Sequence, residues 1–277
     1  MYELPLAYKS LIRTYQPIEA EGLTFYPILV KNMDLFQMGK PAIDVMQQSL
    51  PVRLMSVPLM QAFYTMDYEA IATGEEPIGL LSRCLLFLGL SMRLGETNAE
   101  SIIRRFRLVF DPNDASKLKA VAFTVNGEEM QRITPIQFQR LRPVLAAQNG
   151  IKLVSEMDNP ELVEAEKDLA QGGASLTGDL GEMIATVAAL TGADESEIEE
   201  WPILKLKNRQ NAFSRIFGYL ICSLGQTNGA KWKGGMPHPS LWFERASHES
   251  GALVPLSSMR GAERAVGQQM IQRSENE

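Results

Sequence analysis

The chain has 277 residues, 45% of them hydrophobic, and a formal net charge of −6 at pH 7. This length and composition suit one large or two small domains, each with its own core. The negative charge disfavours a general nucleic-acid-binding protein, because such proteins are usually basic.

The charge is unevenly distributed along the chain. Residues 155–200 contain thirteen acidic residues and one lysine, whereas residues 201–277 contain ten basic and five acidic residues. Such asymmetry is typical of solvated helix faces. It is also compatible with an acidic face and a basic face that dock a partner or a second copy of the chain.

The first predicted elements are a short helix or arm at residues 4–15 and a strand at residues 23–30. Pro27 restricts this strand to a sheet edge or a bulge. Asn32 is placed to cap a helix over residues 33–48, which Gly39-Lys40-Pro41 is expected to break into two. Two further helices follow, one from Ser56-x-Pro58 to Gly74 and a more apolar one from Pro77 to Gly95.

The spacing of apolar residues changes from the helical period to a period of two, typical of strands, at about residues 104–133. Apolar residues alternate in Phe106-x-Leu108-x-Phe110 and in Val121-x-Phe123-x-Val125. Asn126-Gly127 then predicts a two-residue hairpin turn before a returning strand at residues 130–133. We therefore predict an α+β fold, mainly α-helical, in which a helical framework carries a small inserted antiparallel sheet.

Helical periodicity returns after this sheet. Thr134-Pro135 starts a helix that Asn149-Gly150 ends, Asn159-Pro160 starts another, and residues 171–175 form a flexible link. The predicted organisation has three parts. Residues 1–170 are an N-terminal helical region with the sheet, residues 176–225 are a helical pair, and residues 226–277 are an irregular aromatic segment with a polar tail.

The helical pair contains two apolar stripes joined by a tight acidic turn. Gly192 can close the first helix in the left-handed conformation, and Asp194 or Ser196 can cap the second. We predict that the second stripe belongs to the core. Its members are Trp201, Ile203, Leu204, Leu206, Phe213, Ile216, Phe217, Leu220, Ile221 and Leu224. A DNA-binding helix-turn-helix is disfavoured, because phosphates would repel the acidic residues that begin this helix.

Trp232, Trp242 and Phe243 are interleaved with basic residues in the irregular C-terminal segment. Aromatic residues in this setting can stack on nucleic-acid bases. They can also fold back onto the core or anchor in a protein partner, where tryptophan is a frequent hot-spot residue. We retain these three as candidate partner-binding residues.

The sequence lacks the usual markers of catalysis. It contains no phosphate-loop, dinucleotide-binding, hydrolase or zinc-protease motif, and its only histidines are His238 and His248. We therefore predict no catalytic, cofactor-binding or metal-binding residue, and no enzymatic activity. The N-terminus lacks a signal-peptide pattern, and the apolar run at residues 78–90 is too short to span a membrane.

Three stretches resemble a protein family from tailed phages and prophages of Gram-positive bacteria. The run TFYPILVKNMDLF at residues 24–36 is similar to the family's YPI-x-V-K opening. It differs at Met33, which lies in a part of the pattern that is usually aromatic. Residues 138–162 and the helical pair around residues 192–206 are similar to the same family, whereas HPSLWF at residues 238–243 matches loosely. These are signatures of a fold, and the family pattern assigns no binding residue.

The resemblance implies a role in tail morphogenesis through protein–protein binding. It favours a tail assembly chaperone for a tape-measure or tail-tip component in the cytoplasm of the bacterial host. Fourteen methionines fit such a role, since methionine-rich surfaces adapt to varied apolar helices. A baseplate or hub subunit retained in the virion, an unrecognised enzyme and a nucleic-acid-binding regulator remain alternatives. The expected partners are other phage tail proteins, and a homo-oligomer is left open.

Overall fold

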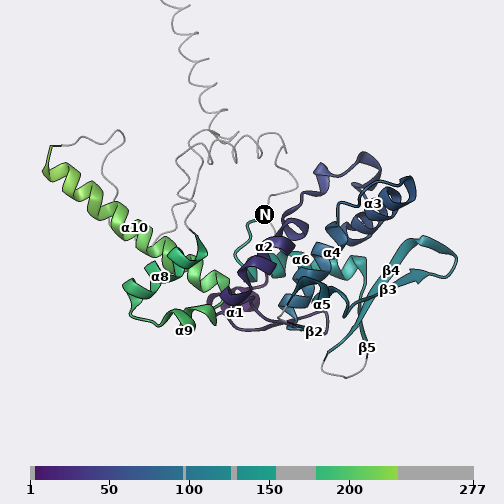
Figure 1. The fold of residues 1–277 in the computed structure, drawn as a ribbon, viewed down its shortest axis with the longest axis horizontal. Helices are drawn as coiled ribbons and strands as arrows, with labels where there is room; N and C mark the ends of the chain where they lie inside the picture. The colour runs from purple at the N-terminus through teal and green to yellow at the C-terminus, as the bar shows by residue number, and fades with distance from the viewer. Residues whose placement is uncertain (1–3, 96–97, 126–129, 154–178, 230–277) are drawn as a thin grey trace, which may run out of the picture. The chain divides into compact units, whose positions relative to one another are not determined.

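The computed structural model describes residues 4–95, 98–125, 130–153 and 179–229 (Figure 1). The fold is α+β and mainly helical, as predicted, and these residues form a two-stranded and a three-stranded antiparallel sheet. The chain divides into two compact units, Met1–Asn211 and Ala212–Glu277. The link expected at residues 171–175 and the helix expected from Asn159 lie outside the described residues.

The first unit begins with a helix and a short hairpin. Helix α1 (Leu6–Arg13) precedes strand β1 (Ile18–Ala20), which pairs with β2 (Leu23–Phe25). The two turn residues between the strands both have positive φ, as a two-residue primed turn requires. The strand predicted over residues 23–30 is therefore too long. It ends at Phe25, and the last residue of the predicted strand, Val30, begins the 3-10 helix η1 (Val30–Asn32).

The core of this unit is built around α2 (Met33–Asp44) and α4 (Leu80–Ser91). The predicted break of α2 at Gly39-Lys40-Pro41 is wrong, because the helix runs through all three residues. A Cβ atom on Gly39 would lie 3.2 Å from the carbonyl oxygen of Arg83, so glycine allows α2 to approach α4 closely. Phe36 and Ile43 of α2 are fully buried. Their burial offsets the helix-breaking tendency of Pro41.

The predicted three-stranded antiparallel sheet is confirmed. It consists of β3 (Arg107–Asp111), β4 (Asp114–Thr124) and β5 (Met130–Ile133), in the order β3-β4-β5. Strand β4 begins seven residues earlier than the pattern indicated. The turn residues 126–129 lie outside the described residues. Thr124 pairs with Met130 in the described register.

Two longer helices pack on this framework. Helix α3 (Leu59–Thr73) ends at Gly74, as predicted, and Gly74 adopts the left-handed conformation. Helix α6 (Pro135–Gln148) begins with a capping box between Thr134 and Gln137. The 3-10 helices η2 (Gln47–Ser49) and η3 (Val52–Leu54) connect α2 to α3.

The helical pair contains three helices instead of two. Helix α8 (Leu180–Thr191) ends at left-handed Gly192, and α9 (Glu195–Glu199) is capped by the side chain of Asp194, as predicted. Trp201-Pro202 then separates α9 from α10 (Ile203–Thr227), so a single second helix was the wrong prediction. Here the backbone is held by the N-terminal segment. The amide of Val30 donates to the carbonyl of Trp201 at 2.8 Å, and the amide of Ile203 donates to the carbonyl of Ile28 at 2.9 Å.

Candidate protein-binding surfaces

A groove of about 540 Å³ lies where α2, α4 and the short helix α5 (Ala99–Ile103) pack together. Its volume is within the range of sites that hold small ligands or side chains of a bound peptide. Most of its lining is apolar. The lining residues are Gln37, Met38, Pro41, Ile78, Gly79, Ser82, Arg83, Leu86, Ala99 and Ile103.

One rim of this groove is fixed by a helix cap. The carboxylate of Asp67, on α3, accepts hydrogen bonds from the amides of Gly79 at 2.9 Å and Leu81 at 3.4 Å. These amides are at the start of α4 and have no partner within the helix. Gly79 has a φ of +72°, which glycine adopts without steric cost. The cap therefore holds the adjacent residue Ile78 at a defined position on the rim.

The rim itself exposes large apolar side chains. Met38 on α2 is 54% exposed, and Ile78 before α4 is 55% exposed. The thioether of methionine adapts to partners of different shape. Arg83 is the single charged residue among those lining the groove. The groove is therefore suited to an apolar protein segment that also offers a hydrogen-bond acceptor to this arginine.

A second groove, of about 590 Å³, lies between α3 and the β3–β4 hairpin and is more polar. Its lining residues are Val57, Gln61, Thr65, Tyr68, Glu69, Asp111, Ser116, Lys117, Leu118 and Lys119. Two of these charges already have partners in the chain, since Glu69 pairs with Arg53 and Lys117 lies 3.0 Å from Asp114. It is therefore less suited to an apolar partner than the first groove.

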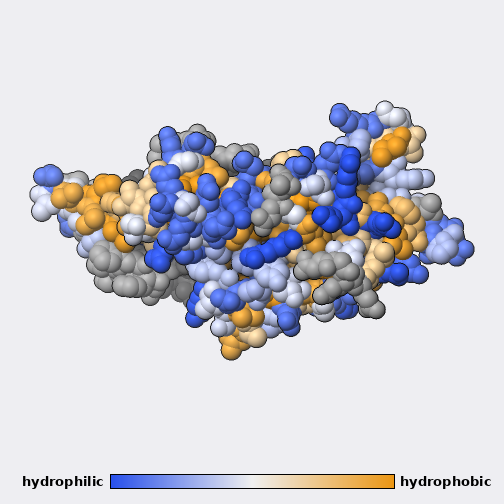
Figure 2. Space-filling view, turned by 60° about the horizontal axis from the view of Figure 1, so that its bottom comes forward, coloured by the Kyte–Doolittle hydropathy of each residue, from blue (hydrophilic) through white to orange (hydrophobic). Residues whose placement is uncertain are grey.

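The second unit contributes a different surface, an apolar stripe on the C-terminal part of α10. We call it the α10 stripe and define it as Phe213, Ile216, Phe217, Leu220, Ile221 and Leu224. The prediction that these residues are core is wrong. Within α10, only Ile203, Leu204 and Leu206 are buried, whereas Ile221 and Leu224 are each 64% exposed. Figure 2 shows apolar side chains gathered along this part of α10, at the left of the view.

Two lysines at the start of α10 have lowered pKa values. The Lys205 ammonium lies 3.6 Å from the ring centroid of Trp201, and the Lys207 ammonium lies 5.0 Å from that of Phe36. Burial is the main cause in both cases, and nearby Lys40 lowers the pKa of Lys207 further. Neither lysine lines the groove. We therefore assign both to packing of the helix start.

The described part of the chain offers no metal site built from several acidic, histidine or cysteine ligands. Among those residues, no group of three or more His, Cys, Asp or Glu could hold a metal ion. Burial in α4 raises the pKa of the Cys84 thiol, so its nucleophilic thiolate form is disfavoured. No described helix combines the length and hydropathy needed to cross a bilayer.

The residues predicted from sequence to bind a partner, Trp232, Trp242 and Phe243, lie outside the described residues, as do both histidines. Sequence reasoning missed the groove, because its lining comes from three separate helices. Met38 and the helix start predicted at Pro77, three residues before α4 begins, were the local signals for it.

The described residues thus form an α+β protein with two exposed apolar surfaces of interest. One is the groove beside α2, α4 and α5, and the other is the α10 stripe. Comparison of the chain with protein-family models, curated proteins and solved structures finds no match.

Proposed function

We propose that this protein acts by binding other proteins, and that it serves as a phage tail assembly chaperone for a tape-measure or tail-tip component in the host cytoplasm. The observation that carries the proposal is the apolar groove with Met38 and Ile78 exposed on its rim. The tail context comes from the family resemblance of residues 24–36, 138–162 and 192–206.

The three resembling stretches meet at one backbone junction. Ile28, in the first stretch, donates its amide proton to the side chain of Asn149 in the second. Its carbonyl accepts from Ile203 in the third. The resemblance therefore concerns the scaffold of the protein, and α2, which begins within the first stretch, carries Met38 into the groove.

A chaperone must hold an aggregation-prone segment and later release it. The groove can accept the apolar face of about one or two turns of an amphipathic helix, as helix-in-groove domains do. Burying one exposed methionine or isoleucine contributes about 1.5–3 kcal/mol at most. Ordering of both partners opposes this gain, so binding through so small a site is weak and reversible. This strength suits transient protection of a long helical tail protein.

Co-expression with the neighbouring tail genes, followed by affinity purification of this chain, tests the proposal. The wild-type chain is expected to retain a tape-measure or tail-tip protein, and the double variant Met38→Glu/Ile78→Glu to retain at least tenfold less. Ile71→Glu/Ile136→Glu is the matched control, because Ile71 and Ile136 are 65% and 59% exposed and neither lines the groove. If no tail protein co-purifies with the wild-type chain, the proposal is wrong.

Analysis of finished particles separates the chaperone from a structural subunit. A chaperone leaves before assembly is complete, so purified particles are expected to lack the chain by quantitative mass spectrometry. Its presence at a stoichiometry typical of tail subunits would instead assign it to the baseplate or hub.

A further inference from the structure

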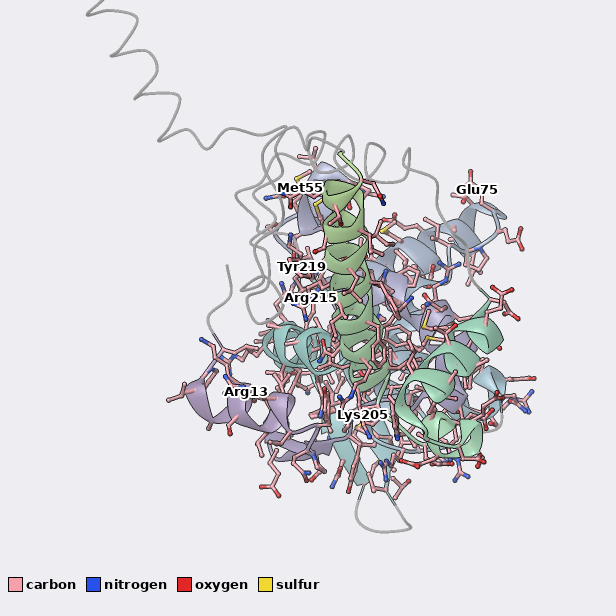
Figure 3. The ribbon with its side chains drawn as sticks, turned by 90° about the vertical axis from the view of Figure 1, so that its left-hand side faces the viewer. Arg13, Met55, Glu75, Lys205, Arg215 and Tyr219 are labelled. Carbon is pink, nitrogen blue, oxygen red and sulfur yellow. The ribbon has the colours of Figure 1, made fainter. Side chains whose placement is uncertain are left out.

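The α10 stripe has the spacing of a helix–helix seam. Phe213, Phe217, Leu220 and Leu224 follow one another at intervals of four, three and four residues, which is the alternation of d and a positions in a heptad. Ile216 and Ile221 flank this seam at g and e positions. Arg215 and Tyr219, both labelled on α10 in Figure 3, fall at the f and c positions of this repeat, away from the seam.

The stripe is also symmetric about its own centre, which lies between Gly218 and Tyr219. Phe217 and Leu220 are equally far from this point, and so are Phe213 and Leu224. In an antiparallel pair of identical helices with a two-fold axis there, each a residue is level with a d residue of the other copy. Phe213 then meets Leu224, and Phe217 meets Leu220, so large aromatic rings lie opposite smaller aliphatic side chains throughout.

The charges of this segment favour a second copy over a partner selected by charge. Residues 212–228 contain one charged residue, Arg215. In the antiparallel pair Arg215 is level with Cys222 of the other copy, so no like charges face each other. Recognition of a foreign partner through ion pairs would need more charged residues than this segment contains.

The exposed area is sufficient for a modest dimer. Five of the six side chains are 36–64% exposed, and Phe213 is half-buried. Together they present roughly 500 Å² of apolar surface, within the range of the largest patches on monomeric proteins. Two copies would bury roughly 1,000 Å², which is the lower limit for a specific interface.

We propose that two copies of the chain associate through the α10 stripe as an antiparallel helix pair centred between Gly218 and Tyr219. The proposal rests on the spacing, symmetry, charge and area of this helix, and it does not depend on the tail-assembly role.

Sedimentation velocity of the full chain over a range of concentrations tests the association. We expect a reversible dimer with a dissociation constant of about micromolar order, as the small area implies. Leu220→Glu is expected to weaken it at least tenfold, and Gln226→Glu, the same charge change at an exposed position off the stripe, less than twofold. Circular dichroism checks that both variants keep their helices. A wild-type chain that stays monomeric, or a dimer that Leu220→Glu leaves unchanged, would overturn the proposal.

Oxidative cross-linking tests the orientation, in a Cys222→Ser background that keeps buried Cys84. In the antiparallel pair, Phe213→Cys in one copy meets Leu224→Cys in the other. Two copies of Leu224→Cys lie about 16 Å apart along the axis, given a rise of 1.5 Å per residue. We therefore expect a covalent dimer from the mixture and little from Leu224→Cys alone. Efficient cross-linking of Leu224→Cys alone would indicate parallel helices and contradict the antiparallel pair.

Discussion

The side-chain oxygen of Asn149 accepts a hydrogen bond from the backbone amide of Ile28 at 2.9 Å. The same side chain donates its amide proton to the carbonyl of Leu145 at 2.9 Å, and it is almost completely buried. Asn149 thus closes the C-terminal end of α6 and binds the N-terminal segment with one side chain. It satisfies polar groups that water cannot reach at this position.

Replacement of Asn149 by alanine is expected to lower the free energy of unfolding by about 1–3 kcal/mol, because the Ile28 amide loses its acceptor inside the protein. Urea denaturation followed by circular dichroism measures this change. Asn211→Ala is the control, since Asn211 is exposed. Equal effects of the two substitutions would show that the Ile28 contact contributes nothing.

Two glycines in helices are expected to respond to alanine with opposite signs. A Cβ atom on Gly89, in α4, would lie 2.2 Å from the buried side chain of Ile102, whereas one on Gly218, in α10, would have no neighbour within 4 Å. Gly89→Ala should therefore cost about 1–3 kcal/mol through overpacking. Gly218→Ala should add about 1 kcal/mol through helix propensity. Thermal unfolding of the two variants checks both signs, and a stabilising Gly89→Ala would contradict the tight contact of α4 with α5.

Arg142, buried in α6, is expected to stabilise the fold by donating hydrogen bonds to the C-terminal end of α2. Its Nε donates to the carbonyl of Ile43 at 2.8 Å, and a terminal nitrogen donates to the carbonyl of Val45. Arg142→Met should lower the free energy of unfolding by about 1.5–3 kcal/mol, the usual contribution of hydrogen bonds from a charged group. In chemical denaturation, exposed Arg140→Met is expected to change it by less than about 0.5 kcal/mol.

The lowered pKa of Lys207 predicts that the stability of the protein depends on pH. Burial, and then Lys40, lowers the pKa of Lys207 in the folded state. Between that lowered value and the unfolded value of about 10.4, the unfolded state binds more protons. The free energy of unfolding therefore rises with pH across this window. Below the window, the charged and buried Lys207 lowers it by a constant amount.

Lys207→Met removes this penalty while keeping an apolar side chain of similar length. We expect the Tm to rise by about 2–4 °C at pH 7, and the gain to shrink as the pH approaches 10. Calorimetry at several pH values measures both effects, with exposed Lys9→Met as the control. A lower Tm for Lys207→Met would mean that the contact with the Phe36 ring outweighs the cost of burial.

Features that depend on a few neighbouring residues could be predicted from the sequence. The left-handed ends of α3 and α8, at Gly74 and Gly192, follow from the freedom of glycine. The cap of Asp194 on the amide of Ser196, at 2.8 Å, is equally local. The period-two pattern likewise sufficed for the three-stranded sheet.

Features that depend on distant contacts could not be predicted. Strand β1 has only three residues, too few for a clear alternation. Pro41 stays helical because α4 packs beside it, and Pro202 separates α9 from α10 because Ile28 and Val30 bind the backbone there. Periodicity shows that a helix has an apolar face but not what covers it. For this reason the sequence pattern of the α10 stripe predicts core, whereas its side chains are largely exposed.

The two hydrogen bonds of Ile28 also set an order of events during synthesis. Its amide can form the hydrogen bond to Asn149 once α6 has been synthesised. Its carbonyl can accept from Ile203 only after about fifty more residues have been added. At translation rates of about 5–20 residues per second, this delay is roughly 3–10 s. During that interval the carbonyl of Ile28 and the amide of Val30 in the nascent chain lack their final partners, Ile203 and Trp201. Slow codons or a stalled ribosome between residues 149 and 203 would prolong this exposure.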